Sequence, residues 1–260
     1  MAGEANAGEA NAGEKSGETS EDGPAAAGVG VKAAPTDGRD RLALVLDTDD
    51  LVAAVRTARA LRSYFGVAKV GLELYSSAGP DAVGALSDLG YDVFCDLKLH
   101  DIPTTVHRAA RVLGALGASH VTLHAHGGED MLRAGVTGLA EGALNAELPP
   151  PMALAVTILT SDADAPPHIL PKRVRLAVEA GCGGIVCAAA DIREARQYAP
   201  RLHMVVPGIR LAGTDTHDQA RTATPSEALD AGADLLVIGR TVTEADDPVA
   251  AAEALVADLG

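Results

Sequence analysis

Long hydrophobic runs are absent from this sequence of 260 residues, although 47% of the residues are hydrophobic. The longest apolar stretches, such as Leu42 to Leu46 and Ala153 to Leu159, are far shorter than the roughly 20 residues that a membrane-spanning helix requires. The amino terminus also lacks the apolar segment of a secretory signal. We therefore expect no membrane span and no export, and we predict a cytoplasmic protein.

Aromatic residues, positive charge and cysteine are scarce as well. Tryptophan is missing, aromatic residues make up 2% of the chain, and the formal net charge is −15. This charge opposes broad contact with a phosphate backbone and argues against non-specific nucleic-acid binding. The three cysteines, Cys95, Cys182 and Cys187, have no CxxC or CxxH spacing. We expect buried, reduced thiols rather than a metal or redox site.

The first 38 residues differ in composition from the rest of the chain. They repeat the segment Ala-Gly-Glu-Ala-Asn and carry seven acidic residues against two lysines. Such a segment buries too little apolar surface to offset the entropy of ordering, so we predict a disordered acidic tail at residues 1–38. This tail acts either as a solvating extension or as a segment that binds a partner. Residues 39–260 have the length of one domain.

Short runs of aliphatic and β-branched residues alternate with longer segments of helical character from Arg41 onward. Glycines after several helices, namely Gly66, Gly90, Gly117 and Gly181, are expected in the left-handed conformation that ends a helix. The predicted strands are Leu42 to Leu46, Val67 to Gly71, Asp92 to Asp96, His120 to His124, Ala153 to Leu159, Gly184 to Cys187, His203 to Pro207 and Leu235 to Gly239. The predicted helices are Asp50 to Tyr64, Pro80 to Leu89, Pro103 to Leu116, Glu129 to Ala143, Pro171 to Ala180, Ile192 to Tyr198, Ser226 to Ala231 and Pro248 to Leu259.

Eight apolar strands, each followed by a helix, predict an α/β fold, a (β/α)8 TIM barrel in a single domain. An open doubly wound sheet is the alternative. That fold usually places a glycine-rich dinucleotide-binding turn after its first strand, whereas this chain has Asp47-Thr48-Asp49-Asp50 there.

Charged residues occur at the carboxyl ends of the predicted strands, where barrel enzymes carry their active sites. The chain has only five lysines, yet Lys69 and Lys98 both fall on apolar strands, where a charge is costly unless it is paired. Asp96 is two residues from Lys98 and therefore on the same face of a strand, while Asp47 and Asp101 supply further acids. We predict an array of alternating charges at the barrel mouth, serving either catalysis or only barrel closure. Asp101 also suits the N-cap of the following helix.

Histidines near the same strand ends are expected outside the reacting set. His124 and His126 flank a single alanine, and His100 precedes Asp101. A lone pair of this kind is more often structural than metal-binding. We therefore predict no metal site.

Phosphate is the expected ligand at the opposite side of the mouth. The loops after strands seven and eight, which commonly bind phosphate in this fold, read Pro207-Gly208-Ile209-Arg210 and Gly239-Arg240. The polar segment Leu211 to Pro225 has the composition of a mobile loop closing over a ligand, with Gln219 as a candidate contact, or of an ordinary surface loop.

The segment Asp96-Leu97-Lys98-Leu99-His100-Asp101-Ile102-Pro103-Thr104-Thr105 resembles the signature of the orotidine 5′-monophosphate decarboxylase family. Further similar segments are Leu46-Asp47, Val67 to Gly71, His124 to Gly128, Val156 to Ser161, Pro207 to Arg210 and Val237 to Arg240, so that the resemblance covers nearly all of residues 41–260.

The resemblance implies decarboxylation of orotidine 5′-monophosphate to uridine 5′-monophosphate without metal or organic cofactor, in a homodimer. It implies that Lys98 protonates C6 of the pyrimidine, that Asp96 faces the substrate carboxylate, and that Lys69 and Asp47 hold the ribose and the charge network. It also implies that Asp101 is a catalytic residue that reaches into the site of the neighbouring subunit. Substrate contacts implied for the remaining positions are Thr105 at the ribose from across the dimer interface, Thr160 at the base, and Pro207, Arg210, Gln219, Gly239 and Arg240 at the phosphate site.

Two other functions remain open from the sequence. Sister barrel enzymes use a similar Asp-x-Lys-x-x-Asp motif on sugar phosphates, normally with magnesium and a metal-binding glutamate that we cannot place here. A non-catalytic nucleotide-binding barrel is the second alternative. The short stretch Asp162 to Pro171 departs from the family pattern and leaves the cover of the base pocket open.

Overall fold

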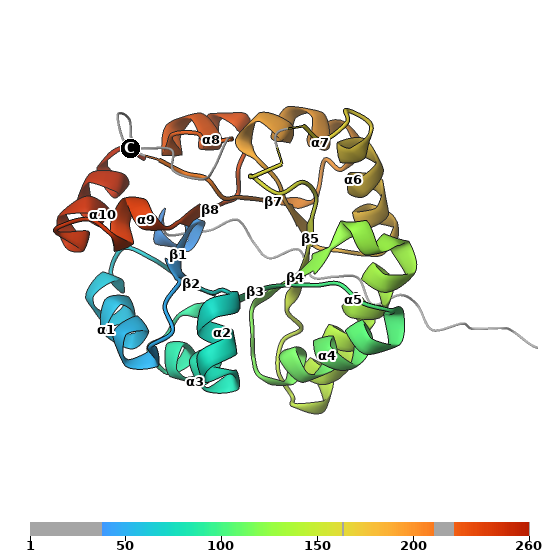
Figure 1. Cartoon of the computed structure of the whole chain (residues 1–260), viewed down its shortest axis with the longest axis horizontal. Helices are drawn as coiled ribbons and strands as arrows, with labels where there is room; N and C mark the ends of the chain where they lie inside the picture. Colours follow the sequence, from blue (N-terminus) through green and yellow to red (C-terminus); the bar gives the residue numbers. More distant parts are fainter. Residues whose placement is uncertain (1–37, 163, 211–220, 260) are drawn as a thin grey trace, which may run out of the picture. The chain divides into compact units, whose positions relative to one another are not determined.

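A computed structural model describes residues 38–162, 164–210 and 221–259. Its eight strands form a closed barrel in the order β1 to β8, and every neighbouring pair is parallel. Figure 1 shows the helices arranged around the outside of the strands. The predicted TIM barrel is therefore confirmed. The strands are β1 (Leu42–Leu46), β2 (Val67–Val70), β3 (Asp92–Leu99), β4 (His120–His124), β5 (Met152–Val156), β6 (Gly184–Val186), β7 (His203–Val206) and β8 (Leu235–Ile238).

All eight predicted helices are present with small shifts of their ends. Asp50 caps the first of them by accepting hydrogen bonds from the backbone N–H groups of Val52 and Ala53. The helices are α1 (Leu51–Leu61), α2 (Leu72–Ala78), α3 (Pro80–Asp88), α4 (Pro103–Ala115), α5 (Gly128–Asn145), α6 (Ile169–Glu179), α7 (Ile192–Tyr198), α8 (Pro225–Ala231), α9 (Arg240–Thr243) and α10 (Pro248–Ala257), with 3-10 turns η1 (Gly38–Arg41), η2 (Ala125–Gly127) and η3 (Ala189–Asp191).

Two short helices were not predicted. Helix α2 begins directly after Gly71, which the sequence predicts to be part of the strand, and α9 begins directly after Gly239. Each has seven residues or fewer, too short for helical periodicity to stand out from the neighbouring strand.

Hydrophobic side chains fill two layers. One lies between the strands and the helices, and a smaller one fills the barrel interior with Ala43, Val67, Phe94, Leu154 and Val205 among its members. Because side chains fill this interior, the barrel is a packed core below the carboxyl ends of its strands and not an open channel.

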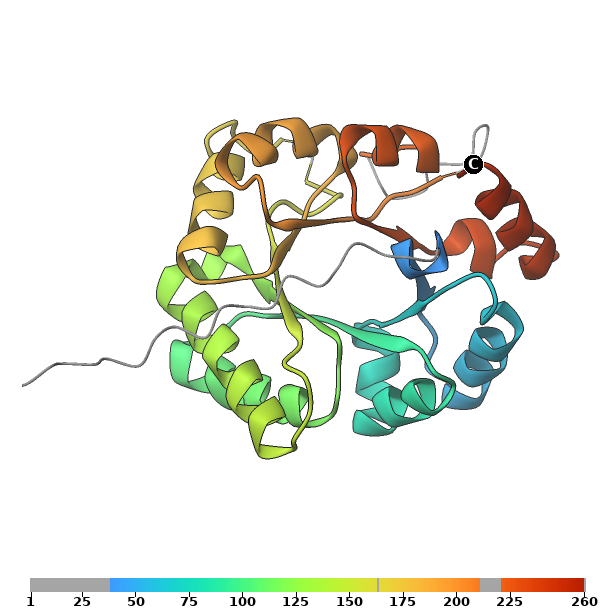
Figure 2. The same ribbon diagram turned by 180° about the vertical axis from the view of Figure 1, so that it is seen from behind.

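The turn η1 precedes β1 and contacts β1, β2 and β8 (Figure 2). The carbonyl of Arg39 in this turn accepts a hydrogen bond from the N–H of Gly66. A Cβ at Gly66 would lie 2.9 Å from the Cα of Asp40 and 3.1 Å from the carbonyl oxygen of Arg39. Gly66 is therefore needed for this close approach, and our prediction of a left-handed conformation there is wrong, whereas Gly90, Gly117 and Gly181 do have positive φ angles.

Candidate active site

A pocket of about 600 Å³ opens at the carboxyl ends of the strands. It takes residues from the ends of β1, β2, β3, β5, β6, β7 and β8, which the parallel topology brings to one end of the barrel. The predicted site residues that line this pocket are Asp47, Lys69, Asp96, Lys98, Thr160, Pro207, Arg210, Gly239 and Arg240.

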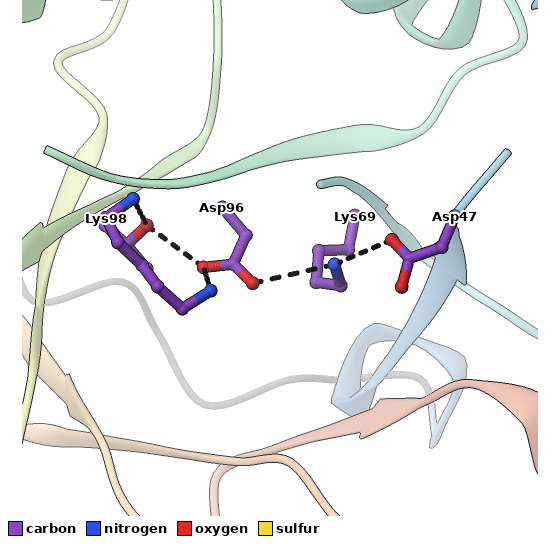
Figure 3. Close-up of polar contacts among 5 residues, drawn as sticks. Asp47, Lys69, Asp96 and Lys98 are labelled. Carbon is purple, nitrogen blue, oxygen red and sulfur yellow. Dashed lines mark hydrogen bonds and ion pairs between the residues drawn. The ribbon is translucent and has the colours of Figure 1, made fainter. Parts of the chain in front are cut away.

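Four charged side chains form a row across one side of the pocket (Figure 3). The ammonium of Lys69 lies 3.4 Å from Asp47 Oδ1 and 3.5 Å from Asp96 Oδ2. The ammonium of Lys98 lies 2.8 Å from Asp96 Oδ1. The predicted alternation of charges is therefore present as Asp47, Lys69, Asp96 and Lys98.

Exposure increases outward from the centre of this row. Only 8% of the Lys69 side chain and 16% of the Asp96 side chain are exposed, compared with 33% for Lys98 and 56% for Asp47. Lys69 is therefore held inside the protein between two acids. Lys98 reaches the open part of the pocket, where its ammonium can meet a ligand.

The backbone of β3 is irregular where it carries the signature. Pairing with β4 passes from Cys95 opposite Val121 to Leu99 opposite Leu123, so four steps on β3 match two on β4. Lys98, within this bulge, has a φ angle of 49°. A left-handed conformation is unfavourable for a residue with a Cβ and is often retained at functional sites. Two-residue spacing alone, on which the sequence prediction relied, therefore does not explain why Asp96 and Lys98 meet.

The pKa of Asp96 reflects a competition between burial and positive charge. Burial raises the pKa of this carboxyl. The charges of Lys69 and Lys98 and the hydrogen bonds from Lys98 and Thr122 lower the pKa, and their combined effect is larger than that of burial. The pKa therefore lies below its ordinary value, and Asp96 is an anion at neutral pH. A second anion brought beside it would be repelled.

Gly71 and Thr122 also belong to this site, and neither is among the predicted site residues. Gly71 follows β2, and a Cβ there would lie 2.6 Å from Asp47 Oδ1 and 3.0 Å from Lys69 Nζ, so any other residue would require the ends of these two side chains to shift. Thr122 on β4 is fully buried, and its Oγ1 donates a hydrogen bond to Asp96 Oδ1 over 3.1 Å. The sequence signal for Thr122 is a hydroxyl between two apolar residues, Val121 and Leu123, in a buried strand.

The opposite side of the pocket carries two arginines, Arg210 after β7 and Arg240 after β8. Gly208, with a φ angle of 79°, forms the turn that follows β7. The hydroxyl of Thr241 donates to the carbonyl of Ile209 over 3.2 Å and so joins the two loops. This pairing of loops is the predicted phosphate side. Gln219 lies outside the described residues.

Asp101 and Thr105 do not line the pocket. One oxygen of Asp101 accepts a hydrogen bond from the N–H of Ile102 over 2.6 Å, and no ion pair joins Asp101 to Lys69 or Lys98 within the described part of the chain. Our prediction of Asp101 as the N-cap is wrong, because Ile102 holds that position and Pro103 begins α4.

The histidines near the site contact one another. The ring centroids of His100, His124 and His126 lie 5.5–6.3 Å apart. Burial first, and then the positive charge of Arg173, lower the pKa of His124 to about 4, so its ring is neutral at pH 7. No cluster of metal-binding side chains occurs among residues 38–162, 164–210 and 221–259.

All three cysteines are buried, as predicted, and form no disulfide. Burial raises the pKa of each thiol to about 12, which keeps it protonated and poorly nucleophilic. No helix in the described ranges combines the length and hydropathy needed to cross a membrane.

Comparisons with known proteins agree with this geometry. Residues 40–255 match the orotidine 5′-phosphate decarboxylase / HUMPS family. The chain is 47% identical to an orotidine 5′-phosphate decarboxylase of Anaeromyxobacter sp. (strain K), over 85% of this chain and 98% of that protein. It is 42% identical to the Moorella thermoacetica protein of the same name, over 85% of this chain and 92% of that one.

Two solved structures are also similar to this chain in fold and sequence. An uncharacterized conserved protein from Geobacillus kaustophilus has a TM-score of 0.71 at 31% identity, covering 84% of this chain and all of that one. Orotidine 5′-phosphate decarboxylase from Lactobacillus acidophilus has a TM-score of 0.69 at 30% identity, covering 85% and 99%. With its closed barrel, its alternating charges and a match over residues 40–255, the chain belongs to the orotidine 5′-phosphate decarboxylase / HUMPS family.

Proposed function

We propose that this protein converts orotidine 5′-monophosphate into uridine 5′-monophosphate and carbon dioxide, the final step of de novo UMP synthesis. The single observation that carries the proposal is the contact of 2.8 Å between Lys98 Nζ and Asp96 Oδ1 at a pocket wall. This contact supports the proposal because a fixed cation and a fixed anion at the pocket wall can meet a carboxylated ring that binds between the charged row and the arginine loops.

Lys98 is the general acid in this proposal. The bond between C6 of the pyrimidine and its carboxylate carbon breaks, carbon dioxide leaves, and the electron pair remains at C6. The ammonium of Lys98 stabilises this developing negative charge and then transfers a proton to C6. Water later returns a proton to the amine. Asp96 keeps Lys98 in place and repels the substrate carboxylate before carbon dioxide leaves.

Binding at the phosphate side supplies the energy that brings these charges together. Arg210 and Arg240 carry the positive charge expected for a phosphate site, and Pro207 and Gly239 shape the two loops. Interactions remote from the reacting carbon can offset the cost of placing a carboxylate beside Asp96. Thr160 contacts the base in this proposal, and Gln219 contacts the phosphate.

The position of Lys69 favours this reaction over a magnesium-dependent reaction on sugar phosphates. Magnesium prefers carboxylate oxygens, and Asp47 and Asp96 supply such oxygens. The ammonium of Lys69 lies between them, at 3.4 and 3.5 Å. It supplies the positive charge that holds both acids, and it would repel a divalent cation. This supports a cofactor-free reaction.

A homodimer completes the site in this proposal. Asp101 and Thr105 lie beside Ile102, a large hydrophobic residue that is 66% exposed, outside the pocket of their own chain. We infer that they reach the pocket of a second copy, where Asp101 extends the charged row and Thr105 contacts the ribose. The buried thiols agree with the proposed cytoplasmic location.

Mixing two inactive variants tests the dimer. Lys98→Ala and Asp101→Asn are each expected to be inactive alone, since each removes one part of every site. After unfolding and refolding together, mixed dimers contain one site with neither substitution, so activity is expected to return to about a quarter of the wild-type value. Activity that stays at the level of the separate variants argues against shared sites.

The function itself is tested with orotidine 5′-monophosphate and a chelator, following ultraviolet absorbance and product. Metal-free formation of uridine 5′-monophosphate is expected from the wild-type protein and from the control Lys172→Ala, which changes the lysine of α6. Lys98→Ala is expected to lose activity by at least about 1,000-fold, since electrostatic and acid catalysis act through one group. Absence of wild-type turnover with the chelator, and turnover of sugar phosphates with magnesium, would support the alternative reaction. Tight nucleotide binding without any turnover would support a binding protein.

A further inference from the structure

We propose that Thr122 is a positioning residue that sets the geometry of both Asp96 and Lys98. The inference rests on the proposed decarboxylation. It concerns a side chain that lies outside the ligand pocket and that the sequence motif does not include.

One hydroxyl of Thr122 contacts both members of the central pair. Its Oγ1 accepts a hydrogen bond from the backbone N–H of Lys98 over 2.8 Å and donates one to Asp96 Oδ1 over 3.1 Å. The same Asp96 oxygen accepts a hydrogen bond from Lys98 Nζ over 2.8 Å. The hydroxyl therefore joins the main chain of the proposed acid to the side chain of its carboxylate partner.

The bulge in β3 creates the need for this hydroxyl. In a regular parallel ladder, the N–H of a strand residue bonds a carbonyl of the neighbouring strand. The register shift between Cys95 and Leu99 and the φ angle of 49° at Lys98 accompany a different arrangement, in which the Lys98 N–H bonds Thr122. A buried N–H without a partner is costly, so this bond stabilises the bulge that aims Lys98.

Thr122 also determines the orientation of the Asp96 carboxylate. Asp96 Oδ2 faces Lys69 and Oδ1 faces Lys98. The hydroxyl adds a neutral donor from β4 and so makes one rotation of the carboxylate preferable to others. This bond also contributes to the low pKa of Asp96. Loss of the hydroxyl is expected to loosen both groups while all four charges remain.

The valine variant, Thr122→Val, tests this role because it keeps the shape and removes the hydroxyl. We expect its kcat for orotidine 5′-monophosphate to fall by about 10- to 100-fold, as for a small misplacement of reacting groups, with KM within about threefold. The acid limb of the pH profile of kcat/KM is expected to move to higher pH, because Asp96 loses a hydrogen bond that favours its anion. Thr122→Ser restores the hydroxyl and is expected to return kcat to within about threefold of wild type.

Thr157→Val is the matched control. Thr157 is also fully buried, and its Oγ1 donates to the carbonyl of Val186 over 2.9 Å, away from the charged row. This variant is expected to lower the thermal unfolding temperature without moving the acid limb or lowering kcat by more than about threefold. If Thr122→Val behaves in the same way, Thr122 has only a structural role and the proposal is overturned.

If Thr122→Val does not fold, a second variant, Thr122→Cys, tests the proposal. Thr122→Cys carries a weaker hydrogen-bonding group. It is expected to show the same loss of kcat and the same shift of the acid limb relative to Thr122→Ser. Equal kcat and equal acid limbs for these two variants overturn the proposal. Absence of wild-type turnover would instead defeat the proposed decarboxylation.

Discussion

Gly71 lies so close to Asp47 that a Cβ on Gly71 would lie 2.6 Å from Asp47 Oδ1. The φ angle of Gly71 is −86°, which alanine adopts without strain, so space rather than backbone conformation requires glycine here. The observed positions of Asp47 Oδ1 and Lys69 Nζ therefore require that no side chain is present at the end of β2.

Gly71→Ala is expected to displace Asp47 and Lys69 and to lower kcat/KM for orotidine 5′-monophosphate by about 10- to 100-fold. Steady-state kinetics and thermal unfolding measure the two effects separately. Gly84→Ala on α3 is the control, because its Cβ would meet no heavy atom within 4 Å. That control is expected to keep full activity and to raise the free energy of unfolding by about 0.5–1 kcal/mol. Wild-type efficiency in Gly71→Ala would show that catalysis does not need this ion pair.

Arg240→Ala tests the phosphate side of the pocket. Loss of a charged hydrogen-bonding partner is expected to lower kcat/KM for the nucleotide by on the order of 10- to 100-fold. The nucleoside orotidine, which has no phosphate, serves as the comparison substrate. Its slower turnover is expected to be equal in wild type and variant. An equal loss with both substrates would place Arg240 in a role other than phosphate binding.

The lowered pKa of His124 predicts that the free energy of unfolding depends on pH. The pKa of this histidine is about 4 in the folded protein and about 6.5 in an unfolded chain. Between these values the unfolded state binds more protons, so the free energy of unfolding falls as the pH is lowered from about 6.5 to 4.

Urea unfolding across this pH range measures the effect. His124→Asn is expected to flatten the slope, since the titrating group is gone. His168→Asn, at an exposed histidine before α6, is the matched substitution for comparison. An unchanged slope in His124→Asn would assign the pH dependence to other groups.

The barrel was predictable because its signals are local. Each strand from β1 to β8 contains a short apolar segment, and alternation of such segments with helices needs no knowledge of distant residues. The strand ends then indicated which polar residues share the barrel mouth. Helix α2 and the left-handed Lys98 were not predictable in this way. The first is too short to show a period, and the second depends on a partner from another strand.

The amino-acid sequence alone determined the eightfold repeat, the location of the charged residues at strand ends and the resemblance to a family, because hydrophobic periodicity and short motifs are read within a few residues. Only the tertiary structure decided which groups meet. Asp47 and Lys69 are 22 residues apart, and Thr122 and Asp96 are 26 apart. Their contacts follow from strand register, from a bulge in β3 and from the space left by Gly71. These features arise when strands distant in the sequence pack together, so they cannot be predicted from a short segment of the sequence.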